Sequence, residues 1–327
     1  IAEWVQWEMT DETGGFYTAL DAGEVGEEGE FYVWSYDELA KVLGGANAAK
    51  FAAVYGCKKE GNFEEEASGK ATGLNVLSLV VPVYEAVDTM RASLLVARNL
   101  RTRPHCDDKI LTSANGLMIG ALAYAGRQFK EPKYTQAAAK AATFVLAKLR
   151  TRDGKLLRSY RAGRAHGAGY LDDYAFLIEG LLELHAADEN PEWLASAQGL
   201  GKGMIAEFED KRGGGFFYVT AEHDNLLMRS KNLLGGGNLP SGNGVAASVL
   251  LRLGNLTGRK EYTEAALGTL DSLSGLLWQS GYGSEALLLA AAESLPHRAT
   301  KKSPHSPDVK LTQGVVDVEL FASRLTV

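Results

Sequence analysis

Cysteine is nearly missing from this sequence. Cys57 and Cys106 are the two cysteines among 327 residues. They are too far apart in sequence for a Cys-x-x-Cys redox pair, and two cysteines in so long a chain do not indicate the disulfide framework of a small secreted domain. A single cross-link and two unlinked thiols both stay open, and unlinked thiols are the expectation. A reducing compartment, the cytoplasm, is therefore predicted.

Long hydrophobic runs are also missing. Runs such as 117–126 and 286–292 are much shorter than the roughly 20 apolar residues that a transmembrane helix needs. The chain begins at Ile1, without Met, in a segment with helical apolar spacing, and no signal-peptide pattern is seen. We therefore expect no membrane partner, and we expect that part of the protein upstream is absent from the chain.

Positive charge is not in excess. Lys and Arg number 34 against 41 Asp and Glu, a formal net charge of −7, and no basic stripe is visible. This balance argues against nucleic acid as a partner. Neither a Gly-x-Gly-x-x-Gly pattern nor a metal-ligand spacing of histidines occurs, so neither a cofactor nor a metal is expected.

What the sequence does contain is an internal repeat. Its copies are residues 131–138 (EPKYTQAA), 190–197 (NPEWLASA) and 259–266 (RKEYTEAA), and their aromatic residues are 59 and then 69 positions apart. Each copy opens a helix with apolar residues at helical spacing. A helix rich in small residues is predicted before each copy, over 115–129, 171–187 and 241–256. The repeating unit is therefore a helical hairpin followed by a glycine-rich return.

Helical hairpins of this kind stack into an open solenoid or close into a toroid of inner and outer helices. The first helix of each pair is rich in Gly and Ala, which suits a crowded inner ring, because a glycine otherwise weakens a helix by about 0.5–1 kcal/mol. We predict an all-α, (α/α)6-type toroid that is incomplete at its N-terminus. The partial toroid spans 1–296, interrupted by an irregular insertion over 23–106. A partly disordered tail spans 297–327, with a short element near 315–325.

Within the insertion, Ser35-Tyr36-Asp37-Glu38 has the pattern of a capping box, which predicts a helix over 36–43. A second helix is predicted over 85–100, closed by Pro104.

Polar side chains gather immediately before or at the start of the predicted inner helices. In a ring, these turns converge on one end, where aromatic faces and carboxylates would suit sugar rings. The predicted catalytic residues are Asp107, Asp108, Asp172 and Asp173, since paired carboxylates perform glycoside hydrolysis. The predicted substrate-binding residues are Phe16, Tyr17, Asp21, His105, Lys109, Asn115, Tyr170, Tyr174, Ser241 and Asn243.

A plainer interpretation competes with each of these motifs. Asp, Ser and Asn are preferred N-cap residues, and acidic residues in a first turn stabilise the helix dipole. A repeat architecture also repeats its caps. The sequence alone leaves both interpretations open.

Four ordered blocks resemble the spermatogenesis-associated protein 20 family of thioredoxin-domain proteins. They are 14–22 (GGFYTALDA) with 28–34 (EGEFYVW), 103–113 (RPHCDDKILTS) with 115–118 (NGLM), 171–175 (LDDYA), and 240–243 (PSGN). The resemblance covers about residues 1–295. Ala114 departs from the family pattern, which has Trp there.

The resemblance implies a thioredoxin-like N-terminal domain, absent from this chain, followed by a toroid of the six-hairpin glycosidase type that is similar to N-acylglucosamine 2-epimerases. It implies a domain that binds or processes carbohydrate, with a glycosidase-like or sugar-epimerase-like activity if it is an enzyme. The alternative is a non-catalytic helical scaffold or protein-interaction module. The sugar, the reaction and the oligomeric state stay open.

Overall fold

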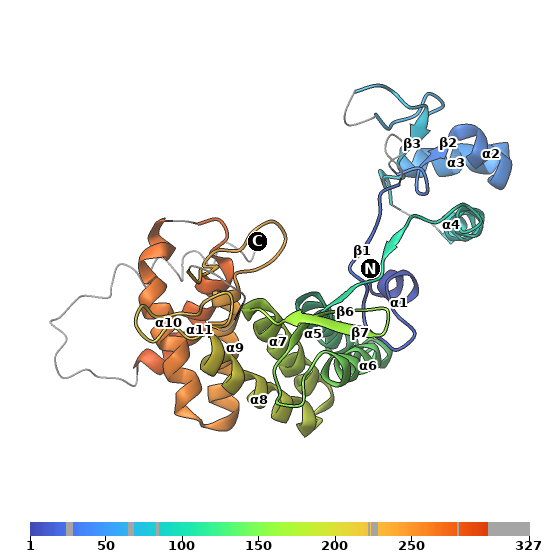
Figure 1. The fold of residues 1–327 in the computed structure, drawn as a ribbon. Coiled ribbons are helices and arrows are strands. Elements are labelled where there is room, and N and C mark those ends of the chain that lie inside the picture. Colours follow the sequence, from blue (N-terminus) through green and yellow to red (C-terminus); the bar gives the residue numbers. More distant parts are fainter. Residues whose placement is uncertain are drawn as a thin grey trace. The chain divides into compact units, whose positions relative to one another are not determined.

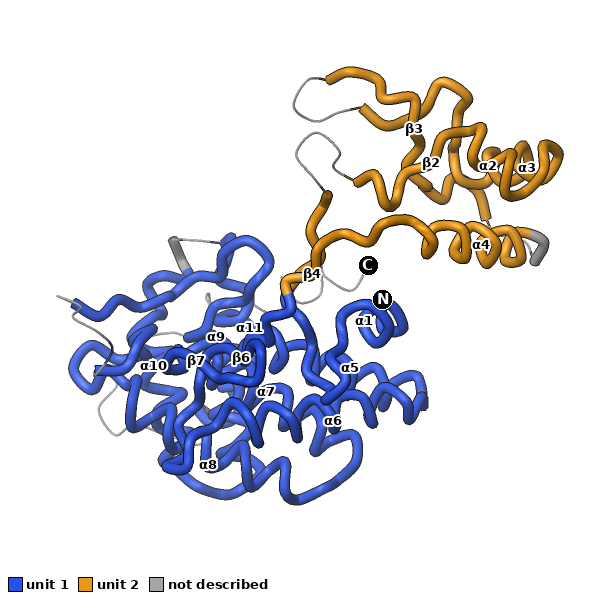
Figure 2. Tube along the Cα trace, turned by 45° about the vertical axis from the view of Figure 1, so that its right-hand side comes forward, with its two compact units in different colours: residues 1–18, 108–327 blue, residues 19–107 orange. Residues whose placement is uncertain are grey.

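The computed structural model describes residues 1–23, 29–64, 69–82, 85–221, 223, 228–279 and 281–299. They divide into two compact units, one made of residues 1–18 with 108–299 and the other of residues 19–107 (Figure 2). The short element expected near 315–325 lies outside the described residues. Helices dominate both units, which confirms the all-α class (Figure 1).

Three helical hairpins form the larger unit. They are α5 (Thr112–Phe129) with α6 (Pro132–Lys148), α7 (Leu171–Asp188) with α8 (Pro191–Phe208), and α9 (Gly242–Thr257) with α10 (Lys260–Gln279). Helix α11 (Glu285–Ala299) follows them, and the short α1 (Ala2–Glu8) precedes them. The first helices pack in succession, α5 on α7, α7 on α9 and α9 on α11, while each second helix packs on the first helix of its own hairpin. This order of inner and outer helices is that of an α/α toroid.

Close contact between the inner helices depends on glycine. A Cβ atom at Gly116 on α5 would lie 2.5 Å from the backbone nitrogen of Leu177 on α7, and one at Gly180 on α7 would overlap the carbonyl oxygen of Gly116. The two helices therefore meet backbone to backbone at this point. This backbone contact explains why the inner layer is as crowded as predicted.

Helix boundaries follow from local sequence signals. Pro132 and Pro191 lie in the first turn of the second helices, where proline has no N–H to lose. Lys130 and Glu189 end α5 and α7 in the left-handed conformation, with φ of 57° and 59°. Helix α11 continues through Pro296 to Ala299, past the boundary expected at 296.

The chain returns between hairpins in three similar turns. Isolated antiparallel bridges join Thr10 to Phe16, Arg150 to Leu156 and Glu209 to Phe216. The first and third returns each contain a Gly-Gly-Phe sequence, at residues 14–16 and 214–216. The second leads into a three-stranded antiparallel sheet that the sequence did not predict, of order β5 (Ile110–Leu111), β6 (Leu157–Arg161) and β7 (Arg164–Ala168).

The unit of residues 19–107 contains α2 (Tyr36–Leu43), α3 (Gly45–Tyr55) and α4 (Glu85–Arg98). Two short antiparallel pairs join β1 (Ala19–Leu20) to β4 (Cys106–Asp107) and β2 (Trp34–Ser35) to β3 (Leu74–Asn75). The predicted capping box of Ser35 and Glu38 is present at α2. Helix α3 was not predicted. The core of this unit consists of its own side chains: Trp34, Leu39, Ala48, Phe51, Val54, Val87, Met90 and Leu94.

None of the described helices is long and apolar enough to cross a membrane.

Candidate functional site

Asp173 joins two inner helices at their N-terminal ends. It lies in the first turn of α7, is fully buried, and accepts hydrogen bonds from the backbone N–H of Ser113 on α5 (2.9 Å) and of Tyr170 (2.8 Å). The guanidinium of Arg158 on β6 lies 3.3 Å from its second oxygen. Burial raises the pKa of this carboxyl, while these hydrogen bonds and Arg158 oppose the rise. Each of its described interactions therefore has a structural role.

Asp172, the neighbouring residue, has a different environment from that of Asp173. Its Oδ1 atom is buried and makes no hydrogen bond with any described residue. A Cβ atom at Gly242 would overlap that oxygen, so the carboxyl lies directly against the start of α9. Burial, followed by the negative charge of Asp173, raises the pKa of Asp172 to about 6, and Arg158 offsets part of the rise.

Aromatic and basic side chains surround this carboxyl. The rings of Tyr170 and Tyr218 have centroids 4.9 Å apart, and the His223 ring lies 5.2 Å from that of Tyr170. The Arg158 guanidinium lies 4.4 Å from the Tyr170 ring centroid. The pKa of Tyr218 is raised by burial and by the charge of Asp172. We refer to Asp172, Tyr170, Tyr218, His223 and Arg158 as the α7 cluster.

The sequence prediction missed three members of this cluster. Tyr218 directly follows Gly214-Gly215-Phe216-Phe217 in the third return, and Arg158 lies on the unpredicted strand β6. His223 carries no pattern that would single it out. The backbone N–H of Leu171 donates to the carbonyl of Tyr218 at 3.0 Å, and this bond fixes the third return beside α7.

The α7 cluster can move a proton and contact a sugar ring. A carboxyl with a pKa near 6 exchanges protons close to neutral pH, as a general acid or base requires. Tyrosine faces pack on the C–H faces of sugar rings, and guanidinium and imidazole groups bind hydroxyls. Within the described residues, no group of His, Cys, Asp and Glu side chains could hold a metal ion.

Asn115 and Asn243 fasten the returns to the inner helices. Both are fully buried. The Asn115 amide accepts from the N–H of Phe16 (2.8 Å) and donates to its carbonyl (2.9 Å). Asn243 makes the same pair of bonds with Phe216, at 2.7 Å and 3.0 Å. These amides are occupied by backbone groups.

Tyr174 and Ser241 have similar structural contacts. The Tyr174 hydroxyl accepts from the N–H of Leu156 in the second return at 2.9 Å. Ser241 is the N-cap of α9: its hydroxyl accepts from the N–H of Gly244 (3.1 Å) and donates to the carbonyl of Leu233 (2.7 Å). Both side chains are buried.

Four further predicted residues lie near the N-terminal end of α5. Phe16 is buried, and the Tyr17 hydroxyl donates to Asp11 (3.1 Å). Asp108 forms an ion pair with Arg161 on β6 (2.5 Å), and the carbonyl of Lys109 accepts from the Thr18 hydroxyl (2.7 Å).

Asp21, His105 and Asp107 belong to the unit of residues 19–107. The N–H of Asp21 donates to the carbonyl of His105 (2.8 Å), and Asp107 pairs with Ala19 across β1 and β4. Of the predicted site residues, the structure thus brings together Asp172, Asp173 and Tyr170.

No protein-family model matches the chain. Among solved structures, cellobiose 2-epimerase from Spirochaeta thermophila is similar at 16% identity and a TM-score of 0.47, covering 60% of this chain and 56% of that one. A GH76 α-mannanase from Bacteroides thetaiotaomicron is similar at 14% identity and a TM-score of 0.48, covering 66% of this chain and 64% of that one.

Sequence comparison identifies closer relatives. Spermatogenesis-associated protein 20 of Rattus norvegicus is 31% identical over 315 residues, and that of Homo sapiens is 30% identical over the same length. Each match covers 84% of this chain and 40% of the relative, so the chain spans about two-fifths of the length of the curated relatives. Over that length, this chain is a homologue of spermatogenesis-associated protein 20.

Proposed function

We propose that the α7 cluster binds a carbohydrate and that Asp172 transfers a proton to or from it. The observation that carries this proposal is the buried Asp172 Oδ1, which has no hydrogen-bond partner among the described residues. An unsatisfied buried oxygen of this kind costs about 1–3 kcal/mol. Asp172 as a residue is only partly buried, so a sugar hydroxyl can approach its carboxyl group, and the tyrosine rings beside it offer a stacking surface.

The arrangement favours one of the two reactions considered. Glycoside hydrolysis ordinarily requires two carboxyl groups that both reach the substrate. Asp173 is fully buried and bonded to two backbone N–H groups, which leaves Asp172 as the carboxyl available in the cluster. Proton transfer by a single carboxyl fits epimerisation of a sugar better than hydrolysis.

Binding tests this proposal. A panel of mono- and disaccharides is screened by thermal shift, and the hits are measured by calorimetry with the wild-type chain, Asp172→Asn and Asp108→Asn. Asp108 is a matched control, because its Oδ1 is likewise buried without a hydrogen bond to any described residue but forms an ion pair with Arg161 outside the cluster. We expect loss of binding in Asp172→Asn and retention in Asp108→Asn.

Two results would contradict the proposal. If no sugar raises the melting temperature, the alternative of a non-catalytic scaffold gains support. If both variants bind a sugar as the wild type does, the ligand lies elsewhere. Conversion of a bound sugar to its epimer, followed by NMR of the sugar protons in D2O, distinguishes catalysis from binding alone.

A further inference from the structure

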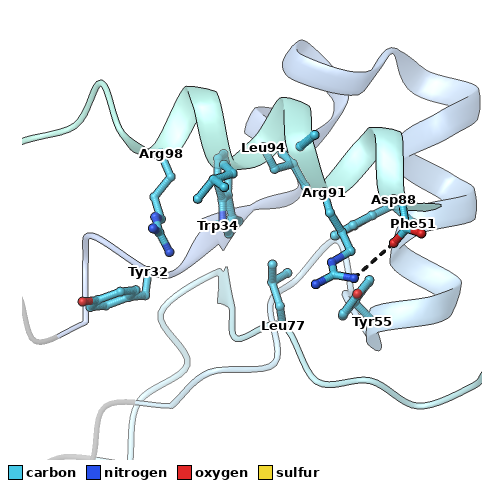
Figure 3. A pocket seen from close by; sticks show the side chains of 11 residues that line it. Tyr32, Trp34, Phe51, Tyr55, Leu77, Asp88, Arg91, Leu94 and Arg98 are labelled. Atoms are coloured by element: carbon cyan, nitrogen blue, oxygen red, sulfur yellow. Dashed lines mark hydrogen bonds and ion pairs between the residues drawn. The ribbon is translucent and has the colours of Figure 1, made fainter. Parts of the chain in front are cut away.

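The unit of residues 19–107 contains a pocket of its own, independent of the α7 cluster. Its volume is about 460 Å³, within the range of about 300–1,000 Å³ typical of small-molecule sites. Helices α3 and α4 and the segments around Trp34 and Leu77 supply its walls (Figure 3). Every lining residue belongs to this unit.

Apolar side chains form the inner surface of the pocket. Trp34, Phe51 and Leu94 are 3%, 1% and 4% exposed and belong to the core of the unit. Leu77 and Tyr55 pack against that core and also line the pocket. A ligand in the pocket would bury an apolar body mainly against Leu77 and Tyr55, which are partly exposed and lie over this core.

Two arginines lie on the pocket wall. Arg91 and Arg98 are seven residues apart on α4, two turns along one face of the helix. The Arg98 guanidinium lies 5.1 Å and 5.6 Å from the ring centroids of Phe31 and Tyr32, which hold it at one side of the pocket. Figure 3 shows Arg91 extending from α4 toward Leu77 and Tyr55.

The Arg91 guanidinium is available for exchange with a ligand. Its ion partner is Asp88, three residues earlier on α4, at 3.1 Å, and the two side chains are 58% and 65% exposed. Exposed pairs of this kind contribute about 0–1 kcal/mol, so an anion can displace Asp88 at little cost. A planar carboxylate matches the guanidinium fork with two hydrogen bonds.

We propose that this pocket binds a small amphipathic carboxylate, with the carboxylate on Arg91 and the aliphatic or aryl body against Leu77, Tyr55 and the core. The combination of an arginine and an apolar interior selects an anion that carries an apolar tail. Neither a free inorganic anion nor a neutral hydrocarbon would use both halves of the site.

Decanoate is the probe for this proposal. Its binding to the whole chain is measured by calorimetry, and 1-decanol serves as the uncharged comparison. Arg91→Gln should weaken decanoate binding severalfold, up to about fivefold, while leaving decanol binding unchanged, because it removes an exposed ion pair and keeps the apolar surface. Arg152→Gln, an exposed arginine of the other unit, should bind decanoate as the wild type does.

A second variant tests the apolar half. Leu77→Trp fills the pocket and should weaken both ligands, and the amide resonances that decanoate shifts in the wild type should fall within residues 32–98. Unchanged decanoate affinity in Arg91→Gln would overturn the proposal, as would the absence of saturable binding. Tighter binding of an acidic peptide than of decanoate would overturn it in favour of a peptide-docking site.

Discussion

Adjacent residues in one helical turn have opposite roles here. Asp173 satisfies backbone N–H groups on two helices, as the capping interpretation of the sequence requires. Asp172 satisfies none and is held with an unpaired oxygen against α9. Within the pair, Asp173 is thus the capping residue and Asp172 is the candidate site residue. A sequence pattern cannot separate the two, because they differ only in which way each side chain points.

The raised pKa of Asp172 makes stability depend on pH in a defined direction. Its pKa is about 6 in the folded chain against a reference of 3.8, so between about pH 4 and 6 the folded chain retains a proton that the unfolded chain releases. The free energy of unfolding should fall as pH rises through this window, by up to about 3 kcal/mol from this group.

Urea unfolding of the wild type and of Asp172→Asn at pH 4, 5 and 6 measures this effect, and the fall should be smaller in the variant. Asp210→Asn is the control of opposite sign. Lys231 and two backbone N–H groups lower the pKa of Asp210 to about 2, so its removal should leave the slope between pH 4 and 6 nearly unchanged. An equal slope in the wild type and in Asp172→Asn would refute the assignment.

At the scale of elements, the repeat extends to the contacts that hold the returns. Asn115, Tyr174 and Asn243 are 59 and then 69 residues apart, the same spacing as the aromatic residues of the outer helices. Each accepts a hydrogen bond from the backbone N–H of a return residue: Phe16, Leu156 and Phe216, respectively. The sequence repeat therefore reflects a repeat of side-chain-to-backbone bonds as well as of helices.

The contact between α5 and α7 provides a test of the inner layer. Gly180→Ala would place a methyl group on the backbone of Gly116, and we expect a loss of about 2–4 kcal/mol in the free energy of unfolding. Gly275→Ala on α10 meets no atom within 4 Å, so it should be neutral or stabilise by up to about 1 kcal/mol. Equal effects of the two substitutions in chemical denaturation would contradict the packing described.

Helices were predictable from the sequence where an apolar period and an end signal coincide. Helix α2 begins and ends at the predicted residues, because Ser35 and Glu38 mark its start. Strand β6 was missed, since its residues are half-buried and mostly polar and its register is set by the distant partner β5. Helix α3 was missed because Gly44 and Gly45 stand at its start, where a cap residue is expected.

The candidate site was predictable only in part for a related reason. Asp172 and Tyr170 lie at the start of a helix that the sequence predicts, and both were selected. Arg158, Tyr218 and His223 come from a strand and a return whose positions depend on tertiary pairing. Asn115 and Asn243 have the residue types of a sugar site, but both are buried and hydrogen-bonded to backbone groups, so their role in sugar binding stays a prediction.

At the scale of the molecule, the chain consists of two units with separate cores. The tail over 297–327, the upstream thioredoxin-like domain and the cytoplasmic location stay predictions, as does the absence of nucleic acid as a partner.

Because the two units have separate cores, we expect a core substitution in one unit to destabilise that unit and not the other. Leu39→Ala removes a fully buried side chain from the unit of residues 19–107 and should cost about 2–5 kcal/mol there. Hydrogen exchange should accelerate in α2, α3 and α4, with little change in α5, α7 and α9. Leu100→Ala, at a position that is 85% exposed in the same unit, should change neither set. Equal acceleration in both sets would show one cooperative core.

The side chain that fastens the second return differs from those that fasten the first and third, and this difference decides which residues can be substituted. Where Asn115 and Asn243 use an amide, the middle hairpin uses the Tyr174 hydroxyl, so its fastening comes from a residue one position beyond the acidic pair. In that hairpin, the side chain that holds the return is thus not that of the candidate site residue Asp172. A substitution of Asp172 therefore leaves the bond that holds its return in place, whereas a substitution of Asn115 or Asn243 removes the bonds that hold theirs.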